Sequence, residues 1–111
     1  MDQDFADRTG AALVVGGSGG IGRAIVRMLG ERGSAVVATY RGSRERAQLA
    51  VDEATAYGVR GEAVALDLLD DAACAAVVEH VVAAYGGLHT LVDAAGPHVP
   101  MRHLGQGAPA E

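Results

Sequence analysis

Short apolar runs alternate along the chain with longer segments in which apolar residues recur every three or four positions. The apolar runs, each of strand length, are 11–15, 35–40, 62–66 and 88–93. The longer segments, whose period is that of a helix, are 20–32, 43–57 and 70–85. The glycines that follow them predict where each helix stops, because glycine readily adopts the left-handed cap conformation; they are Gly33, Gly58, Gly86 and Gly87.

This alternation predicts an α/β fold of the three-layer Rossmann type, in the order βαβαβαβ. Parallel neighbours need a crossover of about a dozen residues or more, and a helix between each pair of strands supplies it. We therefore expect a parallel sheet with helices on its faces. Residues 1–96 are expected to form this unit, whereas 97–111 have no period and are expected to be loop or frayed tail.

Each predicted helix has an apolar face that we expect to pack on the sheet. The expected inner residues are Ile21, Ala24, Ile25, Met28 and Leu29 in the first helix, Ala47, Ala50, Val51 and Ala54 in the second, and Ala73, Val77, Val78 and Val81 in the third. Asp70 is placed to cap the third helix, because its carboxylate can accept a hydrogen bond from the first turn. Tyr57 and Tyr85 lie at helix ends and are expected to be packing residues.

Composition and charge exclude several classes of partner. Half of the 111 residues are hydrophobic, and the formal net charge is −5. Because no basic cluster is present, binding to nucleic acid or to an anionic membrane surface is not expected. No apolar run approaches the roughly 20 residues of a membrane span, and the acidic N-terminus differs from a signal peptide. We expect a cytoplasmic protein.

The cysteine and the histidines give no sign of a redox or metal site. Cys74 lies among alanines and cannot form an internal disulfide, so we expect a buried small side chain in a reducing compartment. The four histidines share no ligand spacing; they are His80, His89, His98 and His103. No metal site is expected.

Five glycines lie within the seven residues 16–22, between the first strand and the first helix. A turn at this place aims free N–H groups and the positive end of the helix at whatever lies above the sheet, which makes an anion site. Glycine is needed where such a turn is tight and where the backbone approaches a pyrophosphate closely. The alternative is a flexible turn without a ligand, but the position between strand and helix favours a ligand.

The glycines fit two registers. Gly17, Gly19 and Gly22 satisfy G-x-G-x-x-G, whereas Gly16, Gly20 and Gly22 satisfy G-x-x-x-G-x-G. In the second register, the segment V15-G-G-S-G-G-I-G22 resembles the T-G-x-x-x-G-(I/L)-G motif of the short-chain dehydrogenase/reductase family. Val15 stands where the family usually has threonine, so a hydroxyl that helps to hold the turn is missing.

The resemblance extends over residues 11–96 and implies a nicotinamide dinucleotide site. It implies that the cofactor-binding residues of the turn are Gly16, Ser18, Gly20, Ile21 and Gly22. It also implies the sheet order 3-2-1-4, with the fourth strand left as an open edge. Self-association, or pairing with another chain, is expected through that edge.

The end of the second strand indicates which cofactor is bound. NAD-dependent members of the family place a carboxylate there, on the adenosine ribose, but this chain has Tyr40 and Arg41, with Arg44 and Arg46 close behind. A carboxylate repels a 2′-phosphate, whereas an arginine pairs with it. We therefore expect NADP(H) rather than NAD, the alternative being a solvated basic start to the second helix.

Two further segments match the family. Asp67, followed by Leu68, stands where a family aspartate accepts a hydrogen bond from the adenine, although Asp67 taken alone could equally cap a helix. The segment L91-V-D-A-A-G96 stands at the place of N-N-A-G, and its Ala95 and Gly96 let the nicotinamide-side ribose lie against the strand end. Asp93 replaces an asparagine that braces the fourth strand, so we expect a weakened brace, or a protonated or water-bridged carboxylate.

The family's catalytic groups have no counterpart in these residues. In full-length members, hydride transfer uses a tyrosine with a lysine four residues later, a serine and an asparagine, all beyond the N-N-A-G segment. This chain contains no lysine and no asparagine, so it has no such tyrosine–lysine pair. We expect the NADP(H)-binding portion of such an oxidoreductase, inactive by itself and ending after the fourth strand. The alternatives are a non-catalytic dinucleotide-binding or subunit-docking module, or a non-functional remnant.

Overall fold

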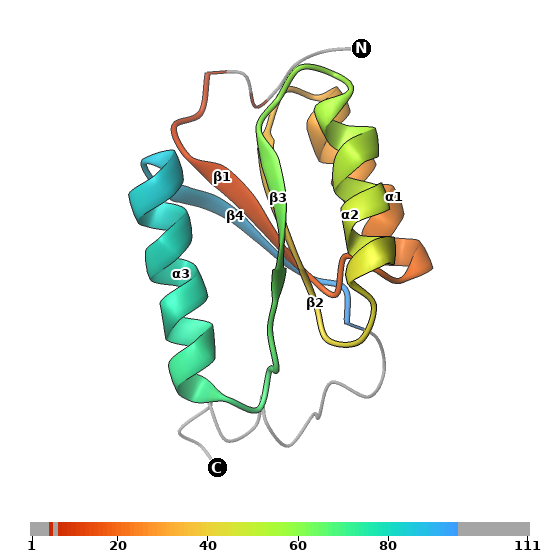
Figure 1. Cartoon of the computed structure of the whole chain (residues 1–111). Helices are drawn as coiled ribbons and strands as arrows, with labels where there is room; N and C mark the ends of the chain where they lie inside the picture. The colour runs from red at the N-terminus through yellow and green to blue at the C-terminus, as the bar shows by residue number, and fades with distance from the viewer. Residues whose placement is uncertain (1–4, 6, 96–111) are drawn as a thin grey trace, which may run out of the picture.

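The structure is a computed structural model that describes residue 5 and residues 7–95. Its elements are β1 (Ala11–Val15), α1 (Gly20–Glu31), β2 (Ala35–Tyr40), α2 (Arg44–Thr55), β3 (Gly61–Ala65), α3 (Asp71–Tyr85) and β4 (Leu88–Asp93). The strands are all parallel and lie in the order β3-β2-β1-β4. Figure 1 shows three layers, with α1 and α2 on one face of the sheet and α3 on the other. The predicted Rossmann-type fold and sheet order are confirmed.

The two central strands are apolar because both of their faces are covered. All five residues of β1 are buried. Ala12 and Val14 pack into the cluster under α1 and α2, whereas Leu13 and Val15 pack into the cluster under α3. Such a strand is a continuous hydrophobic run rather than an alternating one. The sequence run of 11–15 therefore predicted the strand without indicating which residue faces which helix.

The ends of the elements agree closely with the sequence. Ser43 caps α2 by accepting a hydrogen bond from the N–H of Arg46, and Asp70 caps α3 by accepting one from the N–H of Ala73. Gly33, Gly58 and Gly86 follow the three helices with positive φ, as expected. The third strand covers Gly61–Ala65 rather than 62–66, because its partner β2 ends at Tyr40, which pairs with Ala65.

The buried face of α2 was predicted correctly, whereas that of α1 was predicted only in part: Leu29 is buried and Ile25 packs against the same cluster. Ile21 is 74% exposed and Met28 is 37% exposed, although both belong to the predicted apolar stripe, and Ala24 is exposed as well. The residues of α1 that are buried are Gly22, Val26, Leu29 and Gly30. The reason is that α1 packs against α2 as well as the sheet, and Gly30 lets the two helices approach closely.

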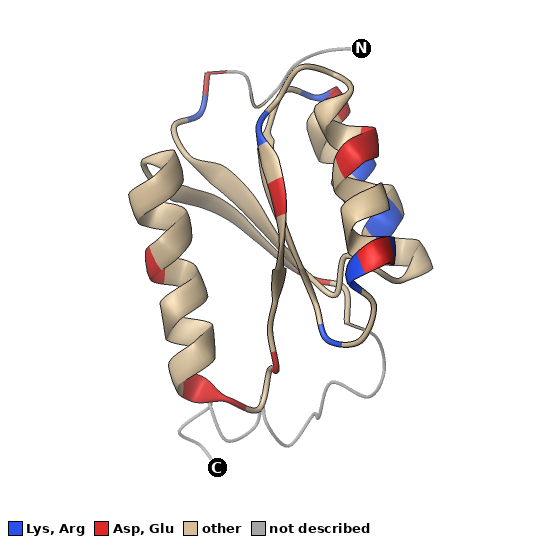
Figure 2. Cartoon of the chain, viewed as in Figure 1, with Lys and Arg blue, Asp and Glu red and all other residues tan. Residues whose placement is uncertain are grey.

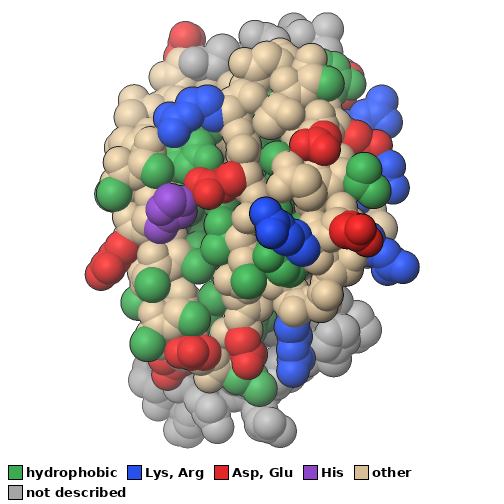
Figure 3. Space-filling model, in the orientation of Figure 1, with side chains coloured by type: hydrophobic (Ala, Val, Ile, Leu, Met, Phe, Trp, Pro, Cys, Tyr) green, Lys and Arg blue, Asp and Glu red, His purple; other side chains and the backbone are tan. Residues whose placement is uncertain are grey.

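Helix α3 packs on the sheet with one narrow face and leaves apolar side chains outside it. Val77 and Val81 are buried, and Ala73 packs against the same cluster. Val78 is 39% exposed, so its predicted inward position is wrong: it lies one residue, about 100°, round the helix from Val77. Figure 2 shows few charged residues along α3, and Figure 3 shows several hydrophobic side chains at its surface. Even so, no helix in the described part of the chain is long and apolar enough to cross a bilayer.

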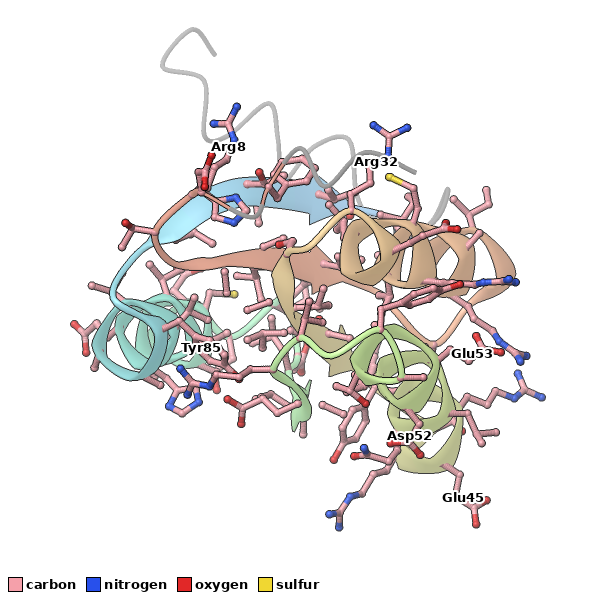
Figure 4. All side chains as sticks on the ribbon, turned by 90° about the horizontal axis from the view of Figure 1, so that it is seen from above. Arg8, Arg32, Glu45, Asp52, Glu53 and Tyr85 are labelled. Atoms are coloured by element: carbon pink, nitrogen blue, oxygen red, sulfur yellow. The ribbon has the colours of Figure 1, made fainter. Side chains whose placement is uncertain are left out.

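Both edges of the sheet differ from its centre. At the β4 edge, Leu91 is 63% exposed. At the β3 edge, one Glu62 carboxylate oxygen accepts a hydrogen bond from the Tyr85 hydroxyl at 2.9 Å and lies 2.8 Å from Nε2 of His80. The Arg60 guanidinium stacks on the Tyr85 ring at 4.3 Å, near the end of α3 (Figure 4). These polar contacts tie the edge strand to α3, where few apolar contacts are available.

Burial and the hydrogen bond to the Glu62 carboxylate raise the pKa of Tyr85 to about 12, so its phenol stays protonated throughout the physiological range. Tyr85 is therefore a packing residue, as predicted. Tyr57, in contrast, lies exposed beyond the end of α2, so the expectation that it packs is wrong.

The close approach of α1 and α2 gives a prediction for Gly30. A Cβ at this position would lie 2.6 Å from Cβ of Ala54 and 2.7 Å from its backbone. We expect Gly30→Ala to lower the free energy of unfolding by about 1–3 kcal/mol, although the same change stabilises an open helical site by about 1 kcal/mol. Urea denaturation followed by circular dichroism measures the difference.

Gly20→Ala is the matched control, because a Cβ on this other α1 glycine has no heavy atom within 4 Å. Its stability should equal or slightly exceed that of the unsubstituted chain. A Gly30→Ala variant as stable as this control would contradict the tight contact between the helices.

Candidate functional site

The main cavity of the described structure lies at the carboxyl ends of the strands. It has a volume of about 280 Å³ and is lined by the turn after β1, the end of β2, the segment after β3 and the two residues after β4. The chain turns back across the sheet between β3 and β4, so β1 and β4 flank the point at which the strand order reverses. In open α/β sheets, ligands bind at this place.

The glycine turn after β1 contacts three other elements, and this contact explains two of its glycines. Gly16 has φ of +84°, and a Cβ there would lie 2.6 Å from Cα of Ala95 after β4. A Cβ on Gly22 in α1 would overlap the carbonyl oxygen of Gly16. Both positions therefore require glycine for the fold alone.

Gly20 differs from these two glycines. A Cβ on Gly20 would meet no heavy atom within 4 Å, so the fold itself does not exclude a side chain there. Gly19, the middle glycine of the alternative register, would make only an ordinary contact, at 3.9 Å, with the carbonyl oxygen of Gly16. The space above Gly20 is open at the start of α1.

The N-terminus of α1 adjoins the cavity through Gly19, which precedes the helix in an extended conformation. Among the described residues, no side chain caps this end, and the first turn contains no acidic residue. The leading N–H groups of a helix have no partner within it, and its dipole makes this end positive. Together with Ser18, which lines the cavity, these groups form a site suited to an anion.

Thr39 holds the other side of the turn, and the sequence reasoning missed it. The N–H of Gly16 donates to the Thr39 hydroxyl at 3.2 Å, and the N–H of Gly17 donates to the Thr39 carbonyl at 3.0 Å. Thr39 lies at the end of β2 and is only 2% exposed. The sequence feature that could have indicated this role is a hydroxyl-bearing residue in an otherwise apolar strand, V36-V-A-T39.

Charged side chains stand at the rim of the cavity. Arg41, which follows β2, is exposed and lines it beside the half-buried Tyr40. Asp67 and Leu68 line it from the segment after β3. One carboxylate oxygen of Asp67 accepts a hydrogen bond from the N–H of Leu69 at 3.0 Å, so Asp67 shapes its own turn and leaves the capping of α3 to Asp70.

The structure brings most, but not all, of the predicted site residues to one cavity. Those that line it are Gly16, Ser18, Tyr40, Arg41, Asp67, Leu68 and Ala95. Gly20, Ile21 and Gly22 lie in the first turn of α1 next to it, with the Ile21 side chain directed into solvent. Asp93 is exposed, and its carboxylate accepts a hydrogen bond from the N–H of Ala95 at 3.1 Å, within its own turn. Gly96 lies outside the described residues.

Cys74 lies near this site, but its thiol is not activated. Its Sγ is 3.7 Å from the carbonyl oxygen of Leu68 and packs against the cluster under α3. Burial, together with the nearby carboxylates of Asp71, Asp70 and Asp67, raises the pKa of the thiol, which therefore stays protonated at neutral pH. Within the described residues, no three His, Cys, Asp or Glu side chains come together to hold a metal ion.

Comparison with known proteins gives relatives that share this architecture. The family model of short chain dehydrogenases matches residues 10–107. A 3-oxoacyl-(acyl-carrier-protein) reductase of Staphylococcus aureus is 41% identical over 79% of this chain and 36% of its own length. An L-rhamnose 1-dehydrogenase (NADP(+)) of Thermoplasma acidophilum is 34% identical over 77% of this chain and 34% of its own length.

Solved structures agree with the sequence relatives. A dehydrogenase/reductase from Sinorhizobium meliloti superposes with a TM-score of 0.76 at 39% identity, over 85% of this chain and 37% of the other. The chain thus spans about a third of the length of the curated relatives that it matches. The match over residues 10–107, the parallel sheet and the glycine turn lead to one conclusion: the chain belongs to the short-chain dehydrogenase family.

Proposed function

We propose that this chain binds NADP(H) in the cavity at the carboxyl ends of its strands. The observation that supports the proposal most directly is the glycine turn. Gly16 and Gly22 bring the backbone of β1 and α1 together, and the space above Gly20 remains open beside the uncapped start of α1. A dinucleotide has a pyrophosphate of the right charge for this position.

In this proposal, the turn binds the pyrophosphate largely through its backbone. Ser18 supplies a hydroxyl, and the N–H groups at Gly20 and Ile21 are among those that a helix leaves without internal partners. Gly16 and Gly22 set the position of the turn and contact the cofactor only through backbone atoms. Because these groups recognise any pyrophosphate, selection between cofactors requires side chains elsewhere.

Arg41 is the side chain that we propose for this selection. It is exposed at the rim of the cavity, beside Tyr40, and Asp67 lines the same cavity after the neighbouring strand β3. Its guanidinium attracts a 2′-phosphate on the adenosine ribose, and Tyr40 lies beside the same ribose. The Thermoplasma acidophilum relative is an L-rhamnose 1-dehydrogenase (NADP(+)), in agreement with this proposal.

The remaining site residues are assigned to the two ends of the cofactor. We propose that Asp67 accepts a hydrogen bond from the adenine with its second carboxylate oxygen and that Leu68 packs on the ring. At the other end, we assign Ala95 and Gly96 to the nicotinamide-side ribose because both are small, and Asp93 supports the turn at Ala95 through its bond to the N–H of that residue.

Bound NADPH supplies the hydride in reductions by this family. Acid–base chemistry on the substrate needs groups that these residues do not provide, because the chain contains no lysine and no asparagine. Tyr85, the phenol with the raised pKa, bonds Glu62 at the β3 edge and does not line the cavity. We propose that this chain provides cofactor binding and is inactive by itself in the reduction of a ketone.

Calorimetric titration with NADPH and, separately, NADH tests the proposal. We expect NADPH to bind more tightly, because only NADPH has the 2′-phosphate that pairs with Arg41. Circular dichroism must first show that the chain is folded. Absence of heat with both dinucleotides, from a folded chain, would mean that the glycine turn serves the architecture alone.

Arg41→Asp should reverse the cofactor preference. Replacing an attraction to the 2′-phosphate by a repulsion weakens NADPH binding by about ten- to a thousandfold and leaves NADH affinity nearly unchanged. Arg46→Asp makes the same change of charge on α2, at a residue that does not line the cavity, and should have a much smaller effect. An unchanged ratio of the two affinities in Arg41→Asp would contradict the assignment.

Gly20→Ala separates the role of the turn in folding from its role in binding. The added methyl group meets no protein atom within 4 Å, so the free energy of unfolding should not fall. The same methyl group occupies the space into which the pyrophosphate is proposed to enter, and NADPH affinity should fall by about tenfold or more. Retention of full affinity in this variant would place the pyrophosphate elsewhere.

A further inference from the structure

Thr39 has an unusual position for a polar residue. Of the described residues, Thr39 and Ser34 are the polar ones that are buried. Thr39 is the next-to-last residue of β2 and pairs with Val15, the last residue of β1. Its hydroxyl therefore lies at the point where β1 leaves the sheet and the glycine turn begins.

The two oxygens of Thr39 accept two successive N–H groups of that turn. The hydroxyl accepts from Gly16 at 3.2 Å, and the carbonyl accepts from Gly17 at 3.0 Å. The carbonyl bond would form with any residue at position 39, but the bond to Gly16 requires the side-chain oxygen. Without it, the N–H of the half-buried Gly16 would lose its protein partner, which costs free energy.

The hydroxyl bond also fixes an orientation. Gly16 has positive φ, a conformation that glycine can enter and leave at little cost, so the orientation of the turn depends on its hydrogen bonds. Val15 has no hydroxyl with which to hold it. The peptide plane between Val15 and Gly16 is held on both sides: its carbonyl oxygen accepts a hydrogen bond from the N–H of Ala94 at 2.8 Å, and its N–H donates to the Thr39 hydroxyl at 3.2 Å. Thr39 supplies the only side chain among these contacts, and the residues up to Gly20 follow directly from that plane.

We propose that Thr39, which also lines the cavity, is a positioning residue for the pyrophosphate site and acts through the Gly16 N–H. This inference rests on the proposed NADP(H) binding. The Thr39 hydroxyl sets the direction of the turn, and the turn sets where Ser18 and the leading N–H groups of α1 point. Loss of the hydroxyl leaves the rim residues Arg41 and Asp67 in place and loosens only the pyrophosphate end.

Thr39→Val tests this role, because valine keeps the shape and the β-branching of threonine and removes the hydroxyl. We expect NADPH affinity to fall by about tenfold, since the side-chain hydrogen bond that holds the Gly16 N–H is lost. Affinity for adenosine 2′-monophosphate, which has the phosphate for Arg41 but no pyrophosphate, should be unchanged. Amide hydrogen exchange at Gly16 should become faster.

Thr39→Ser is the control that should retain NADPH binding, because serine keeps the hydroxyl and lacks only the methyl group. Its stability should fall slightly, while NADPH affinity stays close to that of the unsubstituted chain. Thr39→Ala is a second variant without the hydroxyl and replaces Thr39→Val if that variant does not fold. Thr90→Val removes a hydroxyl from β4 that bonds His89 and should leave binding of both ligands unchanged.

Two results would overturn the inference while leaving the proposed function intact. One is equal NADPH affinity in Thr39→Val and the unsubstituted chain. The other is an equal loss for NADPH and adenosine 2′-monophosphate, which would make Thr39 a packing residue of the whole sheet. No NADPH binding by the unsubstituted, folded chain would instead contradict the proposed function, and this inference with it.

Discussion

The close contact of backbones at the end of β1 is the constraint on which the rest of the structure depends. At this point, Gly16 lies against the segment after β4, its carbonyl oxygen lies against Gly22 of α1, and its N–H bonds Thr39 of β2. Three elements thus meet at one turn, with no room for side chains between them. The position of the first helix, the opening of the cavity and the direction of the leading N–H groups all follow from this contact.

Backbone and side chains have different tasks around that turn. The backbone forms a general anion site, because N–H groups and a helix dipole recognise charge without regard to the rest of the ligand. The proposed choice between cofactors depends on the exposed rim, where Arg41 and Asp67 line the cavity after the neighbouring strands β2 and β3. A rim charge can change without disturbing the core, whereas a change at Gly16 or Gly22 cannot.

The layers of the fold are held in unequal ways. Helices α1 and α2 pack on the sheet and on each other, and Arg23 and Glu53 pair across their outer side, where Glu53 is seen in Figure 4. That exposed pair adds little to stability. Within the part of the chain that the structure describes, helix α3 has no second helix beside it and presents Val78 and Val82 to solvent, while Leu91 is exposed on β4. Exposed apolar side chains also occur on the other side of the sheet, at Ile21 of α1 and Leu49 of α2.

The sequence by itself determined the features that depend on local interactions. The bounds of β1, β2 and β4, the caps at Ser43 and Asp70, and the buried face of α2 follow from short-range patterns in which polar and apolar positions contrast clearly. The family motif added the sheet order and seven residues that line the cavity.

Tertiary structure decided what depends on contacts between distant residues. Helices α1 and α3 have apolar residues on more than one side, so periodicity could not select the buried face, and packing against α2 and the sheet placed Met28 and Val78 outside. Thr39 and Gly16 are 23 residues apart, and no local sequence pattern indicates that they are hydrogen-bonded to each other. A hydrogen bond of this kind exists only after the parallel register of β1 and β2 has brought the strand ends together.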